Sequence, residues 1–576
     1  MKTFQEFVTP DMVTFLLARE RAKCVAHNRS AKARGGASSL DLTAVLDTML
    51  PPHAVWVRPD KRSRAKHDKR WQNTHGITKA IEKARKAAPG NEKDAAYLKN
   101  LDDFITRIQN RAADPNVTLE APSTIPMFKK EKVSGKSVKV IYRPISVYSN
   151  LEDKILIALA SRYLMGIFNS SLHEEILSYR PARLYHGSAR RVITSQTDAV
   201  ANAKHFRDIH GPEIFVAECD IQKFYDIISH DKVLEAFDTL SKQHNIGGYA
   251  SVRPLLKAYL DSYSFLKCVW AENENAKFWE GPRSRYRHGK YAHSTDARFC
   301  FEWVDKESFT DPVHGCYSPA EYTKAVGSIG IPQGGALSPV IADIVMNMVD
   351  QPIIREQDND RFFNRYGDDI LLMHTDRQKC HDLIETYRKS LRDWKFIYHP
   401  FEDFTSYKKG SSTRKCYWDA KSKDAFLWGS GEGQCAEWIG FVGYEIRNDG
   451  AVRLRRSTLD KKFSAINRTY HKLLHVCVPD DKSGRIEYEK KVRFRLSHLT
   501  DSIEKCTLLT RNRYAHAQMG SLDRYRNRKI HKLKDATVRK SGGFLVYDIF
   551  RTMASPEYSF HSRYASLTEE TPAKNK

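Results

Sequence analysis

Long apolar runs are missing from this sequence of 576 residues. No run approaches the roughly 20 apolar residues that a membrane-spanning helix requires, and the first residues, M-K-T-F-Q-E-F-V-T-P, lack the apolar core of a secretory signal. The 10 cysteines are scattered without a C-x-x-C pair, so neither a zinc site nor a disulfide framework is indicated. No internal repeat is visible. We therefore expect a soluble protein of the reducing cytoplasm that has no membrane partner.

Acidic residues are in short supply relative to basic ones. The sequence holds 94 Lys and Arg against 70 Asp and Glu, which gives a net charge of +24. Basic residues gather in stretches such as D-K-R-S-R-A-K-H-D-K-R-W (60–71), close to Trp56. This imbalance favours a polyanionic partner such as RNA or DNA, although a solvated basic surface would have the same composition. The hydrophobic fraction of 41% excludes wholesale disorder.

Two adjacent aspartates, Asp368 and Asp369, stand between apolar runs in R-F-F-N-R-Y-G-D-D-I-L-L-M-H-T (361–375). The apolar runs and the Tyr-Gly pair predict two strands joined by a tight turn. The turn would hold the two carboxylates side by side, where their repulsion calls for a compensating cation, and oxygen ligands suit Mg²⁺. For these four residues alone, an ordinary polar hairpin turn is the alternative.

A third carboxylate is predicted at the end of a strand in F-V-A-E-C-D-I-Q-K-F-Y-D-I-I (215–228). The apolar first half predicts a strand that delivers Asp220 near its end. A site with two metal ions needs such a carboxylate, because the ions must bridge protein oxygens and substrate phosphates. Phe224 and Tyr225 follow closely enough to line a nucleotide sugar, and a place in the core is the alternative for Tyr225.

The stretch G-S-I-G-I-P-Q-G-G-A-L-S-P-V-I-A-D-I-V-M (327–346) is the most specific in the chain. It predicts a loop that carries one amide side chain, Gln333. A helix should begin near Ser338-Pro339, with Ser at the N-cap and Pro at the first position. Glycines in the loop would let a base or sugar approach the backbone.

Residues 125–150 predict two strands around Ser134-Gly135-Lys136, with basic residues at alternate positions. An amphipathic helix is expected over 151–164. Lys139 and Arg143 have the character of triphosphate ligands, since a strand can aim both side chains the same way. A solvent-facing strand edge is the alternative, chiefly for Lys139.

In this order, the blocks resemble a reverse transcriptase of the branch that contains bacterial group II intron and retron enzymes. The blocks that carry the resemblance are Y-R-P-I-S-V-Y-S-N-L-E-D-K-I-L-I-A-L with its follower S-Y-R-P-A-R, the Asp220 strand, G-I-P-Q-G-G-A-L-S-P, Y-G-D-D, and W-I-G-F-V-G-Y-E-I, which resembles a primer-grip hairpin. The resemblance implies an α/β (α+β) right-hand polymerase, with an antiparallel-sheet palm, mixed fingers and a helical thumb.

The expected domains follow from this comparison and from composition. They are a basic helical N-terminal extension over 1–124, fingers and palm over 125–450 with insertions near 265–325 and 408–435, a basic helical thumb and C-terminal region over 451–540, and a C-terminal segment over 541–576 with a flexible tail. In the basic C-terminal helices, Arg524, Arg526 and Arg528 are expected to bind nucleic acid.

The resemblance also implies a reaction. An RNA template would direct the synthesis of a DNA product from dNTPs. Asp220, Asp368 and Asp369 would be the catalytic residues and would hold two Mg²⁺ ions, for which Mn²⁺ can substitute, with Ile221 beside them at the metal site. The residues expected to bind substrate are Tyr225, Gln333, Arg143, Lys139 and Ile221.

Some features depart from the family pattern or leave the role open. Gly367 stands where many relatives have alanine or another residue, and Y-G-D-D also occurs in RNA-dependent RNA polymerases. The lysine expected between the catalytic turn and the primer grip stays open among Lys395, Lys408 and Lys409.

The biological role also has alternatives at this point. The terminal extensions and the lack of an H-N-H endonuclease motif resemble the defence-associated (abortive-infection and unknown-group) reverse transcriptases. Those enzymes act on a dedicated noncoding RNA or prime on a protein hydroxyl. A retron or intron-type enzyme and a catalytically idle RNA-binding scaffold are the alternatives, and a homo-oligomer is compatible with the sequence.

Overall fold

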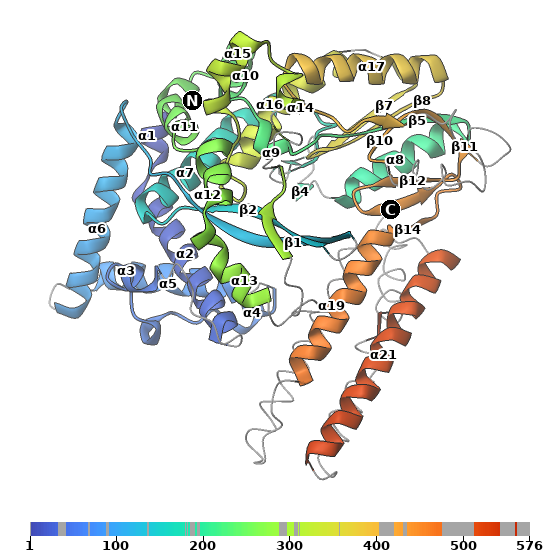
Figure 1. Cartoon of the computed structure of the whole chain (residues 1–576). Helices are drawn as coiled ribbons and strands as arrows, with labels where there is room; N and C mark the ends of the chain where they lie inside the picture. The colour runs from blue at the N-terminus through green and yellow to red at the C-terminus, as the bar shows by residue number, and fades with distance from the viewer. Residues whose placement is uncertain are drawn as a thin grey trace. The chain divides into compact units, whose positions relative to one another are not determined.

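A computed structural model of the chain describes residues 2–32, 42–66, 69–87, 92–134, 137–178, 180, 183–184, 191–192, 196–286, 297–303, 309, 311–355, 358–402, 420–429, 435–474, 512–541 and 559–560. The chain divides into two compact units. The first comprises residues 1–173, 222–351 and 389–397, and the second comprises 174–221, 352–388 and 398–576. Helices and sheets occur together in both units, so the expected α+β class is confirmed (Figure 1).

The first unit begins with helices, as the sequence indicated. They are α1 (Phe4–Phe7), α2 (Pro10–Lys32), α3 (Thr43–Asp47), α4 (Lys61–Lys66), α5 (Lys69–Lys86) and α6 (Glu92–Ala113), with a short 3-10 turn at His53–Val55. Helix α2 packs against α5 and α6 and against α7 (Leu151–Phe168). Apolar side chains at helical spacing, including Val13, Leu17 and Ile108, are fully buried there, which explains why these basic helices fold together.

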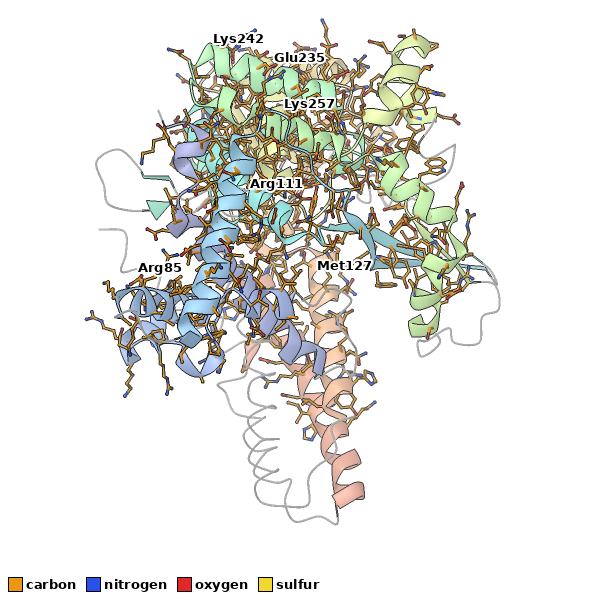
Figure 2. All side chains as sticks on the ribbon, turned by 90° about the vertical axis from the view of Figure 1, so that its left-hand side faces the viewer. Arg85, Arg111, Met127, Glu235, Lys242 and Lys257 are labelled. Atoms are coloured by element: carbon orange, nitrogen blue, oxygen red, sulfur yellow. The ribbon has the colours of Figure 1, made fainter. Side chains whose placement is uncertain are left out.

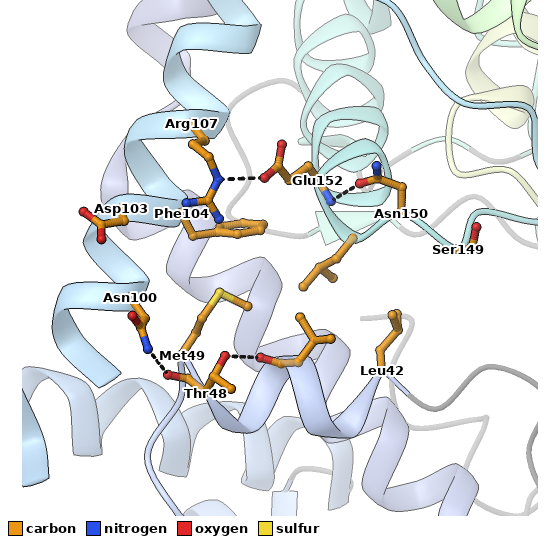
Figure 3. A pocket seen from close by; sticks show the side chains of 12 residues that line it. Leu42, Thr48, Met49, Asn100, Asp103, Phe104, Arg107, Ser149, Asn150 and Glu152 are labelled. Atoms are coloured by element: carbon orange, nitrogen blue, oxygen red, sulfur yellow. Dashed lines mark hydrogen bonds and ion pairs between the residues drawn. The ribbon is translucent and has the colours of Figure 1, made fainter. Parts of the chain in front are cut away.

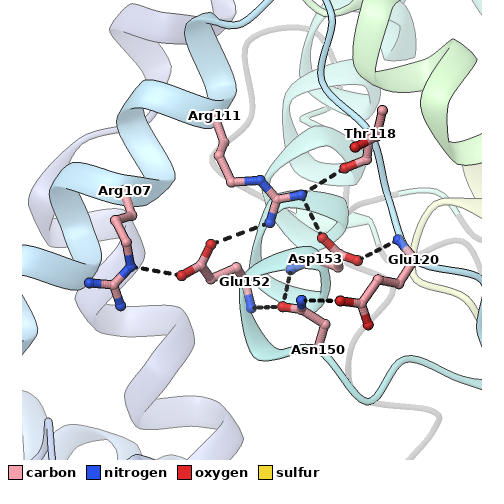
Figure 4. A network of polar contacts seen from close by, with 7 residues as sticks. All are labelled: Arg107, Arg111, Thr118, Glu120, Asn150, Glu152 and Asp153. Atoms are coloured by element: carbon pink, nitrogen blue, oxygen red, sulfur yellow. Dashed lines mark hydrogen bonds and ion pairs between the residues drawn. The ribbon is translucent and has the colours of Figure 1, made fainter.

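A polar network fastens α6 to the first turn of α7 (Figure 4). Arg111 donates to Asp153, whose carboxylate is buried, over 2.7 Å, and Arg107 donates to Glu152 over 2.8 Å. The side chain of Asn150 caps α7 by accepting from the backbone of Glu152 and Asp153. The basic N-terminal helices are therefore tied to the helix that follows the strand pair 123–147, and the domain boundary at 124 stays a prediction.

The same helices line a shallow hollow of about 610 Å³ (Figure 3). Met49 and Phe104 form its apolar part. Asn100 is bonded to the carbonyl of Thr48 and Arg107 to Glu152, so the polar groups on its rim serve the fold. We assign no chemistry to this hollow.

A three-stranded sheet follows, formed by β1 (Ser123–Ser134), β2 (Ser137–Val147) and β6 (Ala297–Phe301). Strands β1 and β2 pair antiparallel as predicted. Strand β6 comes from the expected insertion and pairs with β2 in parallel. Met127 on β1 is 49% exposed (Figure 2), and a β-bulge interrupts β1 between Phe128 and Lys130.

Short helices complete the first unit around this sheet. They are α9 (Phe224–Ile227), α10 (His230–Gln243), α11 (Arg253–Asp261), a π-helix (Leu266–Trp270), α12 (Ala271–Glu274), α13 (Glu280–Tyr286), α14 (Asp311–His314), α15 (Pro319–Ala325) and α16 (Ser338–Ile354), with 3-10 turns at Asn169–Ser171, Tyr249–Ser251, Ala276–Trp279 and Val326–Ser328. Helix α16 begins at the predicted place. The hydroxyl of Ser338 is buried and donates to the carbonyl of Pro332 instead of capping the helix.

The second unit is built on a sheet with the strand order β11-β10-β5-β8-β7. Its strands are β5 (Ile214–Asp220), β7 (Arg361–Tyr366), β8 (Asp369–His374), β10 (Ser422–Trp428) and β11 (Cys435–Ala436), and β9 (Phe401–Glu402) pairs with β10. Helix α8 (Gln196–His210) packs on β7, where the Phe206 and Phe362 rings are 5.4 Å apart. Helix α17 (Arg377–Asp393) follows β8, and two short strands, Arg183–Leu184 and Arg191–Val192, pair separately.

A second small sheet and two long helices end the described chain. Strands β12 (Trp438–Phe441), β13 (Tyr444–Arg447) and β14 (Val452–Leu454) form a meander whose first hairpin is the predicted primer-grip segment. Helices α19 (Arg456–Leu474) and α21 (Arg513–Ser541) lie side by side (Figure 1). Among the described residues, no helix is long and apolar enough to cross a membrane.

Candidate active site

The tight turn at Gly367-Asp368 joins β7 to β8 and presents the two aspartates. Tyr366 pairs with Asp369 across the hairpin, which leaves only two residues in the turn. Gly367 has φ 70°, a value that two-residue hairpin turns require and that glycine adopts without strain. The predicted strand–turn–strand is confirmed, and Asp368 lies at its tip with an exposed side chain.

The turn is braced from behind by Arg365, whose side chain is fully buried. Its guanidinium donates to the carbonyl of Gly367 over 3.4 Å, and its backbone bonds to Glu175 and Leu177 on both sides. A buried cation hydrogen-bonded to a turn resists reorientation of that turn. Arg365 is therefore a positioning residue, and no motif in the sequence singled it out.

Strand β5 brings Asp220 to the same end of the sheet. Strands β5 and β8 pair antiparallel, and Asp220 stands directly opposite Asp369. Directly opposed residues of antiparallel strands have Cα atoms about 4.5–5.5 Å apart. The structure therefore brings the three predicted aspartates together, two on neighbouring strands and Asp368 in the turn beside them.

The three carboxylates of this cluster place their negative charges close together. Loss of hydration in the surrounding protein, together with the charges of Asp368 and Asp220, raises the pKa of Asp369 to about 7. The Asp369 side chain keeps solvent-exposed surface, so repulsion by the neighbouring carboxylates acts beside burial. The charges of Arg455 and Lys421 act in the opposite direction.

Divalent cations fit the donor chemistry of the cluster. Among the described residues, no group of three or more Asp, Glu, His or Cys side chains is gathered around one point at ligand distance. The three carboxylates nevertheless meet at one end of the sheet, and their mutual repulsion is what a bound cation would relieve. Asp220, Asp368 and Asp369 are the side chains that would hold such ions, with the backbone of the buried Ile221 next in the chain.

Lys421 is a member of the carboxylate cluster that sequence reasoning missed. Its ammonium group forms an ion pair with Asp220 and lies 3.2 Å from the ring nitrogen Nε2 of His399. Ser422, the next residue, accepts a hydrogen bond from the backbone of Asp220. The only sequence signal for Lys421 is a lysine just before an apolar strand, within the insertion expected near 408–435.

The three lysines that the sequence left open have separate outcomes. Lys395 has φ 66° and donates to the carbonyl of Cys316 over 3.0 Å, in the first unit. Lys408 and Lys409 lie outside the described residues. Within the described part of the second unit, Lys421 is the lysine that pairs with a predicted catalytic carboxylate.

The second group of predicted residues belongs to the first compact unit. Gln333 lies in the loop before α16, where its carbonyl accepts from the backbone of Ser146 on β2 over 2.8 Å. Its side-chain amide donates to the buried carboxylate of Asp226 over 2.7 Å. Burial raises the pKa of Asp226 to about 6, although the Gln333 hydrogen bond and the charges of Lys223 and Lys129 oppose the rise.

Glycines let the loop come close to neighbouring protein groups, and the approach of a base or sugar to this backbone stays a prediction. A side chain at Gly335 would put its first carbon 2.1 Å from the Tyr259 hydroxyl oxygen, and Gly334 has φ 94°. A larger residue would therefore be strained at either position. The loop also pairs with the segment before α10, because Ile331 donates to the carbonyl of Tyr225 over 2.8 Å.

Tyr225 is half-buried, whereas its neighbour Phe224 is buried, with its ring centroid 5.5 Å from that of Phe396. The core position in this pair therefore goes to Phe224. On β2, Arg143 is exposed and Lys139 is half-buried. The two side chains lie on the same face of the strand, four residues apart, and their contact with a nucleotide stays a prediction.

The C-terminal arginines divide into two kinds. Arg524 and Arg528 are exposed and line a groove of about 510 Å³ with Phe463 and His531. Arg526 is only 5% exposed and forms an ion pair with Asp523. Our expectation that all three contact nucleic acid is corrected for Arg526, because residues two apart on a helix point in different directions.

Comparison with known families gives the enzyme class. Residues 285–400 match the family described as reverse transcriptase (RNA-dependent DNA polymerase). This range of the chain is therefore similar to a reverse transcriptase domain. The matched range includes Gln333, Asp368 and Asp369, and Asp220 precedes it. The match supports the enzyme class of RNA-directed DNA polymerases. It does not distinguish the bacterial defence branch from other branches.

Solved structures offer only a remote likeness to this chain. The chain is similar to telomerase from Candida albicans in complex with a TWJ fragment of telomeric RNA, at 12% identity over 90% of this chain and 77% of that chain, with a TM-score of 0.29. It is also similar to apo telomerase from Candida tropicalis, at 12% identity over 90% of this chain and 82% of that chain, with a TM-score of 0.32. No curated protein matches the chain in sequence.

Proposed function

We propose that Asp220, Asp368 and Asp369 hold two Mg²⁺ ions during RNA-directed DNA synthesis by this protein. The observation that carries the proposal is the direct pairing of Asp220 with Asp369 across β5 and β8, with Asp368 in the adjoining turn. Bound ions would supply positive charge that favours the 3′-hydroxylate of the primer and the leaving pyrophosphate. Mn²⁺ can take the same oxygen ligands.

The chain's own residues prepare the cluster for these cations. Lys421 supplies a positive charge to Asp220 through their ion pair. Arg455, which is half-buried, adds positive charge toward Asp369. The ammonium group of Lys421, which lies beside the carboxylates, could also pair with a phosphate of the substrate. Arg365 would keep the turn, and with it Asp368, in place throughout.

Residues of the first unit would select and hold the nucleotide. We propose that Tyr225 lines the sugar, and that Arg143 and Lys139 contact phosphates. The amide of Gln333 already donates one N–H to Asp226. An amide has a second N–H and a carbonyl oxygen, so Gln333 can hold the loop and contact the nucleotide together.

A role in bacterial antiphage defence is the finer part of the proposal. The net charge of +24 supports an RNA partner, here a dedicated noncoding RNA as template, or a protein hydroxyl as primer. A retron or intron-type enzyme is the alternative within the class. Sequencing the RNA and DNA that copurify with the protein from its native host tests this role, and a single abundant structured RNA is the expected result.

The reaction itself is tested by primer extension. The full chain is incubated with an RNA template, a DNA primer and dNTPs, with Mg²⁺, with Mn²⁺ and with EDTA. We expect DNA synthesis that requires the metal. A complete lack of incorporation on RNA and DNA templates and without a primer, with either metal, would instead support a catalytically idle RNA-binding scaffold.

A further inference from the structure

Three lysine side chains of the first unit converge on a single carboxylate, Glu302. The ammonium group of Lys130 lies 3.0 Å from Glu302 Oε1, and that of Lys223 lies 2.5 Å from Oε2. Lys129 also pairs with Oε2. In the described part of the chain, none of these lysines forms an ion pair with another carboxylate. The buried carboxylate of Asp226 also acts electrostatically on Lys223, so three basic groups stand against two acidic ones.

Irregular backbone aims the two neighbouring lysines the same way. In a regular strand, successive side chains point to opposite faces, so Lys129 and Lys130 could not both reach one carboxylate. The β-bulge in β1 falls between Phe128 and Lys130 and leaves Lys129 as the extra residue. A bulge of this kind turns a side chain to a new direction, and here it gathers both ammonium groups on Glu302.

The other two members of the cluster also depend on unusual backbone. Lys223 has φ 48° and Trp303, which follows Glu302, has φ 75°. Such values are uncommon for residues with a side chain and cost free energy that the surrounding structure must supply. A bulge and two left-handed residues at one ion cluster indicate that the cluster is a built feature of the fold.

Glu302 is held in place by the expected insertion. It follows β6, whose last residue, Phe301, donates its N–H to the side chain of Asn273 over 3.0 Å. Trp303 is buried against Phe265 and Phe309. Partial burial favours the protonated acid, but the hydrogen bonds and charges of Lys129 and Lys223 outweigh it and hold the pKa of Glu302 well below its usual range.

We propose that Lys129, Lys130 and Lys223 form a polyphosphate-binding site and that Glu302 occupies this site as an internal competitor until a polyphosphate displaces it. The side chains of the four residues remain 18–29% exposed for Lys129, Lys223 and Glu302 and 43% exposed for Lys130, so a solute can reach them. A polyphosphate carries more negative charge than one carboxylate and offers more acceptor oxygens to three ammonium groups. The proposal that this ligand is the nucleotide's triphosphate rests on the proposed polymerase function.

The test measures binding of inorganic tripolyphosphate to the full chain by isothermal titration calorimetry, without template, primer or metal. We expect Glu302→Gln to bind tripolyphosphate about tenfold more tightly than the wild type, because the competing charge is gone. Glu235→Gln is the matched control. It removes one negative charge from an exposed pair with Lys232 on α10 of the same unit (Figure 2) and should leave the affinity unchanged.

A second variant keeps the test decisive if Glu302→Gln fails to fold. Lys130→Gln, at the most exposed of the three lysines, should weaken tripolyphosphate binding about tenfold at an unchanged melting temperature. Unchanged or weaker binding by a folded Glu302→Gln protein would overturn the proposal and leave Glu302 as a structural support of β6. Unchanged binding by Lys130→Gln would overturn it as well.

Pyrophosphate and dATP, titrated in parallel, distinguish the sources of the polyphosphate. A gain with Glu302→Gln for tripolyphosphate and dATP supports the nucleotide as the ligand, whereas a gain confined to tripolyphosphate and pyrophosphate supports the product side. Because no synthesis is measured, this result is separate from primer extension. A protein that binds polyphosphate as expected but makes no DNA would refute the proposed polymerase function and leave the site standing.

Discussion

The two units each contain a cluster of like charges, and the clusters are built in opposite ways. In the second unit, Asp220, Asp368 and Asp369 stand on regular strands and a tight turn. In the first, Lys129, Lys130 and Lys223 are gathered by a β-bulge and a left-handed residue around Glu302. Regular pairing brings the acidic side chains together, whereas irregular backbone brings the basic ones together.

The clusters also differ in how their charge is balanced. Burial and repulsion among the carboxylates raise the pKa of Asp369 even though Lys421 pairs with Asp220 and Arg455 adds positive charge. Glu302, in contrast, forms ion pairs with all three lysines. The acidic cluster is therefore suited to cations supplied from solution, and the basic cluster is suited to an anion that can replace an internal one. The following substitutions test this contrast.

Removing one carboxylate from the acidic cluster should have the largest effect. Asp368→Asn takes away a charge that the metal ions need while leaving the turn intact, because Asp368 is exposed. We expect primer extension to fall about a thousandfold, which is on the order of 4 kcal/mol of transition-state stabilisation. Asp208→Asn, an exposed position on α8 in the same unit, is the control. Incorporation within tenfold of the wild type would remove Asp368 from the metal site.

The buried carboxylate beside the basic cluster should respond to pH. Asp226 is 4% exposed, and burial raises its pKa to about 6 in spite of Gln333, Lys223 and Lys129, with Glu302 adding to the rise. The folded state thus holds the proton more tightly than the unfolded state, so stability falls as the pH rises from about 4 to about 6. Asp226→Asn still accepts from Gln333 and cannot ionise. It should stabilise the fold by up to about 3 kcal/mol at pH 8 and by almost nothing near pH 4.

Urea titrations of both proteins at the two pH values measure this difference. Asp261→Asn, at an exposed acid of the same unit, should show no comparable gain. Equal stability changes for Asp226→Asn at both pH values would mean that Asp226 does not titrate as its burial implies.

Helix α21 is a third charged region, and it contains both exposed and buried arginines. Replacing Arg524 and Arg528 by Gln should weaken RNA binding and reduce the slope of log affinity against log salt by up to roughly 0.7–0.9 per lost phosphate contact. Arg526→Gln should lower the melting temperature with little change in that slope, because Arg526 is buried next to Asp523. Filter-binding titrations at several salt concentrations decide the matter, and identical slopes for the double variant and the wild type would leave these arginines as a solvated surface.

Local patterns were enough to predict the elements that carry the aspartates. The β7–β8 hairpin, the strand that ends at Asp220 and the helix that begins at Ser338 depend on apolar runs, turn residues and helix-start chemistry within about ten neighbouring positions. The resemblance to reverse transcriptases then indicated how these elements are arranged in one fold. The fold class and the meeting of the three carboxylates followed from these two sources.

Contacts between distant positions could not be predicted in the same way. Lys421 reaches Asp220 across 201 positions, and Lys129 reaches Glu302 across 173. The residues on either side of these two lysines resemble those around many other lysines of this basic chain, so the local sequence does not distinguish them. The bulge in β1 is not marked by a turn residue in the sequence. The burial of Arg526 depends on how α21 packs, which the local sequence does not determine.

The smallest expected effect concerns the choice of sugar at Tyr225. The ring is half-buried while Phe224 takes the core position, which favours a wall for the nucleotide over a structural role. A close-packed wall excludes a 2′-hydroxyl because it cannot yield without strain. Tyr225→Ala should therefore lose about tenfold of its dNTP over rNTP selection, about 1.4 kcal/mol, while dNTP incorporation largely survives. Steady-state incorporation of matched dNTP and rNTP, with a melting curve for each protein, measures this.

Phe224→Ala is the contrasting variant, and it should lower the melting temperature and reduce both activities together. If Tyr225→Ala behaves in that same way, Tyr225 is a core residue. If the wild type prefers rNTPs, the acidic cluster serves RNA synthesis instead.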